Sequence, residues 1–383
     1  MARPVAFFLL QALLVAAAIP AALRSTRLRA SSPFVLPQHA IVRDAQPLFT
    51  ADFLPTVKTT FVHAATLAEM PNGDVLAAWY GGYDEISPDV RIFAARLDHA
   101  TGRWSEPRPI ADRAGTARGL GMRIKSLGNP VLYRDRGGLK LYFVAVVFGG
   151  WGGSTICLSS SPDGVQWSPP RHVQASPFFN LGMLVRGIPW TYADGTTSLP
   201  IYHEMGNKWA GVARVDAAGR VIDSVRIEDQ RTLIQPWTVA TDPDHALAFL
   251  RWGSPTPGHV TFAASSDRGA TWGSVRTTSL VHRDSAVAVI QLDDGSLLAI
   301  YNNSPHTRRS LALARTRDAG ATWTQPVTIE DDRAPDDNVV RREYSYPYVL
   351  RGSDGRIHLV YTYRRTAIRH IVFNDAWVAE AVK

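Results

Sequence analysis

The chain has 383 residues, of which 45% are hydrophobic and 20% are charged, and its formal net charge is +7. This hydrophobic fraction allows a large buried core and argues against a disordered chain. No cluster of basic residues with interleaved aromatic residues stands out, so we expect no nucleic-acid partner, whereas a basic cleft for an acidic ligand is favoured. The single cysteine, Cys157, excludes a disulfide within the chain.

An apolar run at residues 5–23 follows Arg3 and is rich in alanine and leucine. Such a run predicts a secretory signal or an uncleaved membrane anchor over residues 1–30. We therefore expect an exported protein, periplasmic or secreted, and leave open whether the segment is cleaved or anchors it to an inner membrane. Residues 31–37 are expected to form a linker, and residues 31–383 the folded domain.

Six tight turns, each followed by an apolar strand, recur along the rest of the chain. They lie at residues 71–74, 136–138, 194–195, 242–245, 293–295 and 354–355. The strands that follow them are expected at residues 75–79, 139–147, 198–202, 246–250, 296–301 and 356–361. A repeat of this length predicts an array of similar structural units.

A second motif alternates with these turns. Residues 265–272 read SSDRGATW and residues 316–323 read TRDAGATW. In such a box the Asp accepts backbone N–H bonds, the Gly takes a positive φ, and the Trp packs on the neighbouring sheet. Degenerate copies lie at residues 98–104, 163–167 and 216–221.

Together the two motifs predict an all-β fold, a six-bladed β-propeller that follows the N-terminal signal or anchor helix. Closing the sheets into a ring leaves only short, protected strand edges. We expect the last segment, residues 368–377, to close the ring with the N-terminal strands.

Seven further segments carry a resemblance to a known family. They are HAATLAEMPNGDVLAAWYGG (63–82), SPDV (87–90), GNPVL (128–132), LPIYHE (199–204), YNNSP (301–305), EYSYP (343–347) and HLVYTYRR (358–365). On these segments the chain resembles the sialidase superfamily, in particular its bacterial and plant branch of Asp-box (BNR-repeat) proteins. The resemblance implies a glycan-active propeller with its site in the central funnel.

The resemblance also implies three arginines that bind the carboxylate of sialic acid, and two of those positions differ here. His63 stands where the family has the Arg of an R-I-P motif, and Gly82 and Tyr83 occupy the place of the second Arg. An imidazole cannot offer the bidentate fork of a guanidinium. We therefore expect a glycan that is not bound as in a standard sialic acid site.

The loop at residues 83–89 contains three carboxylates, Asp84, Glu85 and Asp89. The resemblance implies a general acid in this loop, with Glu85 and Asp89 as the leading pair and Asp84 as a substrate contact. Burial of one carboxylate would raise its pKa as a general acid requires. The alternative is an ordinary solvated acidic loop.

The EYSYP segment is the candidate for the nucleophile. The resemblance implies a nucleophilic Tyr at Tyr344 with Glu343 beside it. Strand alternation places Glu343 and Ser345 on one face and Tyr344 and Tyr346 on the other, so only one pair can line the funnel. Which pair does so stays open, and a Tyr packed between blades is the alternative.

The remaining candidates are polar residues at or near the ends of apolar strands. Glu204 is a candidate nucleophile or base, although it and its neighbours could equally be ordinary blade-edge residues. Candidate substrate contacts are Arg123, Lys125, Asn129, Arg186, Tyr202, His203, Arg251, Asn302, Arg364 and Arg365. We expect two or three of the cations to line the site.

These patterns favour an exported, sialidase-like glycoside hydrolase with a carbohydrate as its partner. Two alternatives remain, a propeller that binds a polysaccharide without cleaving it and a polysaccharide lyase that uses Tyr and His. The chain contains no HExxH motif, no cysteine cluster and no phosphate-binding loop, so we expect no metal and no cofactor.

Overall fold

The computed structural model describes residues 32–42, 45–176, 180–227, 232–254, 258–332 and 343–383. The predicted signal or anchor helix at residues 1–30 lies outside the described residues. Within the described part of the chain, no helix is both long and apolar enough to cross a membrane.

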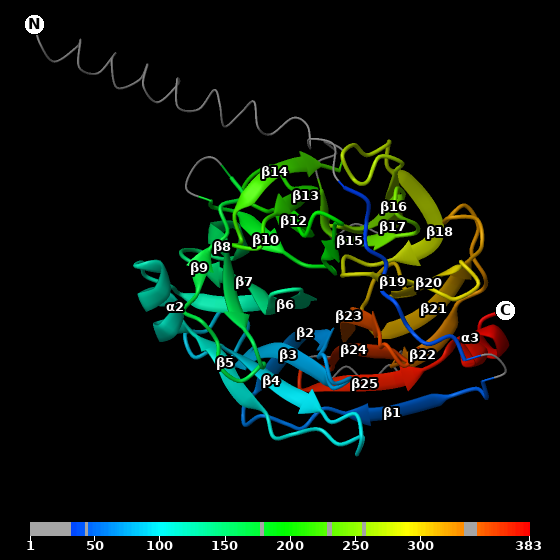
Figure 1. Cartoon of the computed structure of the whole chain (residues 1–383), viewed down its shortest axis with the longest axis horizontal. Helices are drawn as coiled ribbons and strands as arrows, with labels where there is room; N and C mark the ends of the chain where they lie inside the picture. Colours follow the sequence, from blue (N-terminus) through cyan, green and yellow to red (C-terminus); the bar gives the residue numbers. More distant parts are fainter. Residues whose placement is uncertain (1–31, 43–44, 177–179, 228–231, 255–257, 333–342) are drawn as a thin grey trace, which may run out of the picture.

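Six antiparallel sheets lie around a central axis, which confirms the predicted six-bladed propeller (Figure 1). Blade one contains β2 (Phe61–Glu69), β3 (Val75–Gly82), β4 (Arg91–Leu97) and β5 (Arg108–Asp112). Blade two contains β6 (Ser126–Asp135), β7 (Gly138–Val146), β8 (Ser154–Ser161) and β9 (Arg171–His172). Blade three contains β10 (Met183–Val185), β11 (Trp190–Thr191), β12 (Thr197–His203), β13 (Trp209–Val215) and β14 (Val221–Arg226).

The second half of the ring repeats the pattern. Blade four contains β15 (Leu233–Ala240), β16 (Ala246–Trp252), β17 (Gly258–Ser265) and β18 (Arg276–His282). Blade five contains β19 (Ala288–Gln291), β20 (Leu297–Tyr301), β21 (Ser310–Thr316) and β22 (Val327–Asp331). Blade six contains β23 (Tyr344–Arg351), β24 (Ile357–Tyr363) and β25 (Ala367–Phe373). Three short helices join or follow these strands: α2 (Arg113–Leu120), the 3-10 helix η1 (Trp151–Gly153) and α3 (Asp375–Ala381).

The N-terminal strand β1 (Phe49–Phe53) closes the ring as the outer strand of blade six. It pairs antiparallel with β25, from Phe49 opposite Phe373 to Phe53 opposite Arg369. This pairing confirms the expected closure between the C-terminal segment and an N-terminal strand. Blade six is thereby completed from both ends of the chain.

The segment before β1, part of which was expected to be a linker, is packed against the ring. Phe34 is buried, and its ring stacks on Tyr192 at 4.9 Å. The N–H of Phe34 donates to Pro243 in blade four, and that of Ala40 donates to Ser353 in blade six, both at 2.8 Å. Residues 34–40, which we call the strap, therefore cross one mouth of the ring (Figure 1).

The Asp boxes form the turns between the two outer strands of their blades. In the box of blade four, Asp267 accepts hydrogen bonds from the N–H of Thr271 at 2.9 Å and from its hydroxyl at 2.6 Å. In blade five, the ring of Trp323 meets Phe249 of blade four edge-on at 6.1 Å. The boxes thus stabilise turns and hold neighbouring blades together, as predicted.

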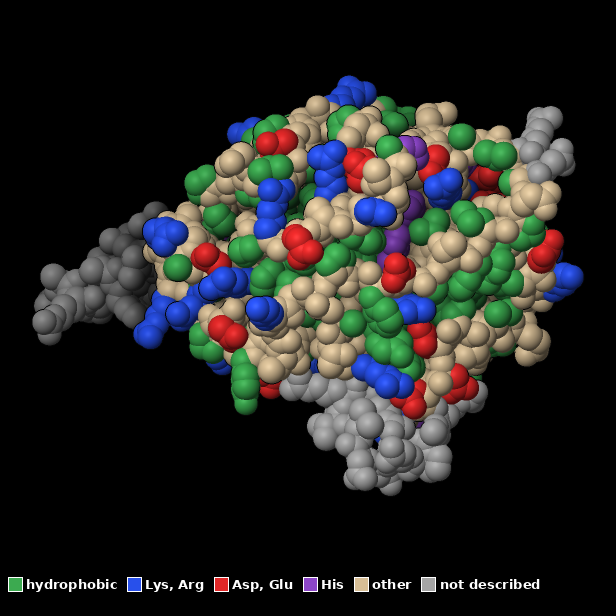
Figure 2. Space-filling view, turned by 90° about the horizontal axis from the view of Figure 1, so that it is seen from below, with side chains coloured by type: hydrophobic (Ala, Val, Ile, Leu, Met, Phe, Trp, Pro, Cys, Tyr) green, Lys and Arg blue, Asp and Glu red, His purple; other side chains and the backbone are tan. Residues whose placement is uncertain are grey.

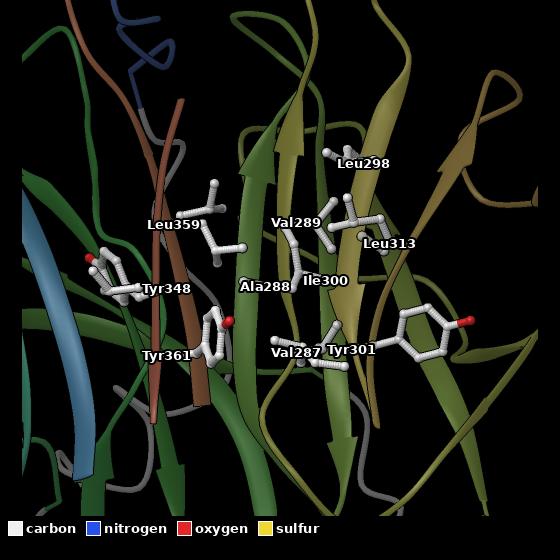
Figure 3. Packing of buried hydrophobic residues seen from close by; sticks show 14 of the residues in the cluster. Val287, Ala288, Val289, Leu298, Ile300, Tyr301, Leu313, Tyr348, Leu359 and Tyr361 are labelled. Atoms are coloured by element: carbon white, nitrogen blue, oxygen red, sulfur yellow. The ribbon is translucent and has the colours of Figure 1, made fainter. Parts of the chain in front are cut away.

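Apolar side chains from adjacent blades form the core between the sheets. Figure 3 shows this packing where blade six meets blade five, with Leu359 and Tyr361 beside Ala288 and Ile300 in one buried cluster. On the face drawn in Figure 2, Lys and Arg side chains alternate with Asp and Glu, and no continuous basic stripe is visible among the described residues.

Two buried histidines in blade six should make the stability of the fold sensitive to pH. His358 Nδ1 lies 3.1 Å from His370 Nε2, and burial lowers the pKa of His358 to about 4 and that of His370 to about 3. In the unfolded chain the histidine pKa values are near 6.5, so below this pH the unfolded chain binds protons that the buried pair in the folded chain does not bind. We expect the contribution of this pair to the free energy of unfolding to be complete above about pH 6.5 and to fall as the pH is lowered toward about 4. Urea unfolding at a series of pH values measures it.

The control for this prediction exchanges the titrating groups. The double variant His358→Gln/His370→Gln should show a flatter pH profile than the wild type, whereas His306→Gln, at an exposed histidine, should leave the profile unchanged. Identical profiles in all three proteins would contradict the role of the pair.

Candidate functional site

The inner strands of four blades break their register at the same place. The breaks lie between His63 and Thr66, Gly128 and Val131, Ile234 and Trp237, and Ser345 and Tyr348. Each break holds one residue in the left-handed region, namely Ala64 (φ 49°), Asn129 (42°), Gln235 (50°) and Tyr346 (56°). At three of them a Pro follows, which suits a position where the ladder hydrogen bond is already lost. Strained backbone of this kind is concentrated at functional sites.

The break in β23 changes which side chains share a face. Ser345 Oγ donates to Glu343 Oε1 at 2.6 Å, and His63 connects the two sides, 3.9 Å from Glu343 Oε1 and with its ring 4.3 Å from that of Tyr346. The ring of Tyr344 instead packs on Tyr363 at 5.2 Å. Simple alternation, which pairs Tyr344 with Tyr346, is therefore wrong here because the bulge turns Tyr346 to the side of Glu343.

The hydroxyl of Tyr346 lies in a network of buried polar groups. Arg251 Nη1 donates to it at 2.8 Å and to Gln235 Oε1 at 3.0 Å. Gln235 Nε2 approaches the Tyr346 hydroxyl at 3.4 Å and donates to that of Tyr202 at 3.2 Å, which also accepts from Asn129 at 2.8 Å. The residues at three of the register breaks are thus joined by one hydrogen-bond network.

Several arginines surround Tyr346. The guanidinium carbons of Arg186, Arg251 and Arg308 lie 5.4, 5.8 and 5.8 Å from the centre of its ring. Arg365 adds a fourth guanidinium through an ion pair with Glu343. The site is therefore rich in guanidinium groups although His63 and Gly82 replace two expected arginines.

Arg186 forms the floor of this site. Its side chain is fully buried and donates to the carbonyl oxygens of Ala65 at 3.2 Å, Tyr346 at 3.0 Å and Pro347 at 3.3 Å. It makes no ion pair with a described residue. Its two terminal nitrogens instead fix the backbone of two register breaks at the channel axis.

The acidic loop of blade one reaches the site through Glu85. Arg365 Nη1 donates to Glu85 Oε2 at 2.8 Å, and Arg365 Nε pairs with Glu343 Oε1 at 2.9 Å. Tyr80 donates to Glu85 Oε1 at 3.2 Å. Burial acts to raise the pKa of Glu343, but Arg308 and Arg365 outweigh it and the pKa is lowered. Glu343 is therefore held as a carboxylate.

His63 is a buried, neutral imidazole. Burial and the positive charges of Arg365, Arg308, Arg186 and Arg251 hold its pKa well below its usual value. Its Nδ1 lies 2.9 Å from the hydroxyl of Thr362, and its Nε2 is buried without a hydrogen-bond partner among the described atoms. One ring nitrogen is therefore unpaired but closed off from solvent.

Glu204 differs from Glu343 in the direction of its pKa shift. Burial raises its pKa, against the attraction of Arg251 and Lys208. The neighbouring His203 stacks on Trp209 at 5.6 Å, and its Nδ1 lies 2.9 Å from the carbonyl oxygen of Asn207. Of this expected pair, Glu204 is the one with the shifted pKa, and His203 is held by its local turn.

Two expected acids stabilise the acidic loop. Asp84 accepts the N–H of Glu85 at 2.8 Å, and Asp89 accepts that of Tyr83 at 2.9 Å. Hydrogen bonding by Ser87 and by the Tyr83 backbone lowers the pKa of Asp89, which is the opposite of what a general acid needs at neutral pH.

Four expected substrate contacts have other surroundings. Arg123 is exposed, and Lys125 Nζ donates to the Gly149 carbonyl at 2.5 Å. Asn302 is buried and donates to the carbonyl oxygens of Ser310 at 2.9 Å and Tyr344 at 2.6 Å, which joins blades five and six. Arg364 pairs with Asp332 at 2.9 Å.

Sequence reasoning missed Tyr80, Gln235, Asp284 and Arg308. The sequence does contain a signal for Gln235. In blade four a Gln-Pro pair begins six residues before the turn residue Thr241, and in blade six the pair Tyr346-Pro347 begins six residues before the turn residue Gly352. Asp284, which pairs with Arg251 at 2.5 Å, and Arg308 lie in polar loops without such a marker. Among the described residues, no group of three His, Cys, Asp or Glu side chains could hold a metal ion.

Comparison with known proteins agrees with this architecture. Residues 73–359 match the BNR repeat-like domain family. No curated protein matches the chain.

Solved structures share the fold at low identity. A Hadza microbial sialidase, Hz136, superposes with a TM-score of 0.67 at 16% identity, over 83% of this chain and 66% of that chain. A Dyadobacter fermentans protein described as of unknown function superposes with a TM-score of 0.66 at 13% identity, over 85% of this chain and 97% of that chain. The intramolecular trans-sialidase of Ruminococcus gnavus superposes with a TM-score of 0.63 at 15% identity, over 85% of this chain and 96% of that chain. The expected resemblance to the sialidase superfamily is confirmed for the fold.

Removing the floor of the site should destabilise the protein. In Arg186→Met, three buried carbonyl oxygens lose their donor, and we expect the free energy of unfolding to fall by about 3 kcal/mol in urea titrations. Arg123→Met, at an exposed arginine, is the matched control and should change it by less than about 0.5 kcal/mol. Equal stability of the two variants would argue against the role of Arg186.

Proposed function

Because this chain belongs to the BNR repeat-like domain family, we propose that it is a glycan-processing enzyme, a glycoside hydrolase that acts on a sugar carrying a negative charge. The observation that carries this proposal is the opposite shift of two carboxyl pKa values, Glu204 upward and Glu343 downward, in one arginine-lined site. Carboxyl groups with pKa values driven apart are the usual basis for an acid and a base in glycoside hydrolysis.

The charge of the site supports an anionic substrate. Arg251 is paired with Asp284, and Arg365 is paired with both Glu85 and Glu343. Arg186 has no carboxylate partner among the described residues. Arg308 donates hydrogen bonds from Nε and Nη2 to the carbonyl oxygen of Asp284, and its Nη1 lies 3.6 Å from Glu343 Oε2. A sugar carboxylate would add the negative charge that this cluster lacks.

The reaction begins with binding of the anionic group by the arginines around Tyr346. Glu204, whose raised pKa keeps its proton available, donates that proton to the leaving oxygen of the glycosidic bond. Tyr346, whose hydroxyl accepts a hydrogen bond from Arg251, is the candidate nucleophile. Glu343, held as a carboxylate, takes the phenol proton as Tyr346 attacks the anomeric carbon, and water then hydrolyses the glycosyl–tyrosine bond with Glu204 as the base. The buried, neutral His63 lies between Glu343 and Tyr346 and keeps them in position.

A second candidate function, polysaccharide lysis, has a specific observation in its favour. The neutral His63 and the ring of Tyr346 lie 4.3 Å apart beside Arg251 and Arg308. In a lyase the arginines would neutralise a uronate carboxylate, a neutral His would take the proton beside it, and a Tyr would deliver a proton to the leaving oxygen. This reaction yields an unsaturated sugar and consumes no water.

The test is a screen of the purified protein on glycans with neutral, uronic acid and sialic acid residues. We expect cleavage of an acidic glycan, with at least a roughly hundredfold loss in Glu204→Gln and Tyr346→Phe and little change in the control Asp89→Asn. Activity should fall as the pH rises through the raised pKa of Glu204, because the acid then loses its proton, and Glu204→Gln should lose that limb of the profile.

Each other outcome separates the alternatives. Full activity in both variants would remove the proposed acid and nucleophile. Neutral glycans cleaved as fast as acidic ones would contradict the anionic substrate. An ultraviolet-absorbing unsaturated product would identify a lyase, and saturable binding without turnover of any glycan would identify a binding protein.

We also propose that the protein is exported, on the basis of the apolar run at residues 5–23. Fractionation of cells that produce the full chain should place it outside the cytoplasm, free or held at the inner membrane. Recovery in the cytoplasmic fraction would contradict export.

A further inference from the structure

The mouth of the central channel that faces the strap contains a cavity. Its volume is about 340 Å³, and the inner side of every blade contributes to its wall. One apolar residue from each blade illustrates this: Leu67, Leu132, Ile188, Trp237, Val289 and Tyr348. A cavity of this size falls within the range of small-molecule sites.

This cavity is separate from the Tyr346 site. The wall of the cavity is formed by the parts of the inner strands that follow the register breaks in the chain. The guanidinium of Arg186 lies between the two, 5.4 Å from the ring of Tyr346 on one side and 5.5 Å from that of Tyr348 on the other. A ligand in the cavity would therefore not contact Glu204 or Glu343.

The wall is apolar because its aromatic residues use their polar atoms within the protein. Trp237 Nε1 donates to the Val289 carbonyl at 2.7 Å, and Trp190 Nε1 donates to that of Thr238 at 2.9 Å. The Tyr348 hydroxyl lies 3.4 Å from the carbonyl oxygen of Leu132. Water in such a space finds few partners, and apolar cavities bind apolar molecules instead.

The strap covers part of the cavity. Leu36, Pro37 and His39 belong to its lining, and His39 Nε2 lies 2.7 Å from Asp293 Oδ1 in blade five. The strap is thereby fixed at both ends, at Phe34 and at His39. It narrows the mouth over an apolar interior, which suits a slender ligand.

The rim also offers a cation. Arg134 lines the mouth and is exposed, and its side chain makes no ion pair or hydrogen bond with a described residue. Glu69, also at the rim, accepts the N–H of Ser353 at 2.8 Å and its hydroxyl at 2.6 Å. Arg351 is paired with Asp375 at 2.7 Å. Arg134 is therefore the rim charge left to meet a ligand.

We propose that this cavity binds a free single-chain amphiphile, with its apolar chain among the six inner strands and its anionic head at Arg134. At roughly 30 Å³ for each small group, the volume corresponds to a chain on the order of a dozen carbon atoms. Burial of such a chain against a dry wall supplies the affinity, and the guanidinium selects the head group.

Calorimetric titration of the full chain with sodium decanoate and with 1-decanol tests the proposal. We expect one decanoate per chain with a negative heat-capacity change, and weaker binding of the uncharged alcohol. Arg134→Gln should weaken decanoate binding severalfold and leave decanol binding unchanged. Absence of saturable binding of either probe would overturn the proposal.

A filled cavity is the second arm. Ala68→Leu/Ala240→Leu adds three carbon atoms at each of two wall positions and should weaken decanoate binding at least tenfold, without changing glycan cleavage. Unchanged affinity in this variant, with its fold confirmed by circular dichroism, would overturn the proposal. Should the variant fail to fold, xenon diffused into crystals of the wild-type protein must occupy the cavity, and its absence there would count equally against the idea.

Discussion

The site depends on a break in strand register that recurs on the inner strands. In an unbroken strand, Glu343 and Tyr346 would face opposite ways. A bulge with Tyr346 at φ 56° turns the tyrosine toward His63 and Arg251. A non-glycine residue in this region costs about 1–3 kcal/mol, and Arg186, through its hydrogen bonds to the carbonyl oxygens of Tyr346 and Pro347, helps to offset that cost. The geometry of the site and the buried cation beneath it are therefore parts of one arrangement.

Burial alone does not decide the protonation of the groups around this bulge. It favours the neutral form of His63, Glu204 and Glu343 alike, yet the three differ because of their neighbours. Arg308 and Arg365 keep Glu343 ionised, and together with Arg186 and Arg251 they keep His63 neutral. At Glu204 the attraction of Arg251 and Lys208 is too weak to reverse the effect of burial. Burial and the arrangement of guanidiniums thus give Glu343 a lowered pKa, His63 a neutral ring and Glu204 a raised pKa.

The propeller could be predicted from the sequence because its markers are local. The Asp-box and Gly turns act within a few residues, and their spacing counts the blades. The site was only partly predictable. His63, Glu343 and Arg365 lie in the family segments, and Arg251 directly follows an apolar strand. Which side of β23 faces the site could not be predicted, because strand alternation fails at a bulge. Arg308 is brought to the site by the curvature of the ring, which no short motif encodes.

The pairing of β1 with β25 has a consequence for the order in which the molecule forms. Phe49 and Phe373 stand side by side in one sheet although nearly the whole chain lies between them. Contacts of such long separation form late, because the chain must first lose the entropy of closing a large loop. During synthesis the first five blades can therefore assemble in sequence, whereas β1 remains unpaired until β25 has been made. The strap, which leads into β1, gains its contact with Ser353 of blade six only when the last blade is complete, so it reaches its final position over the channel at the end of folding.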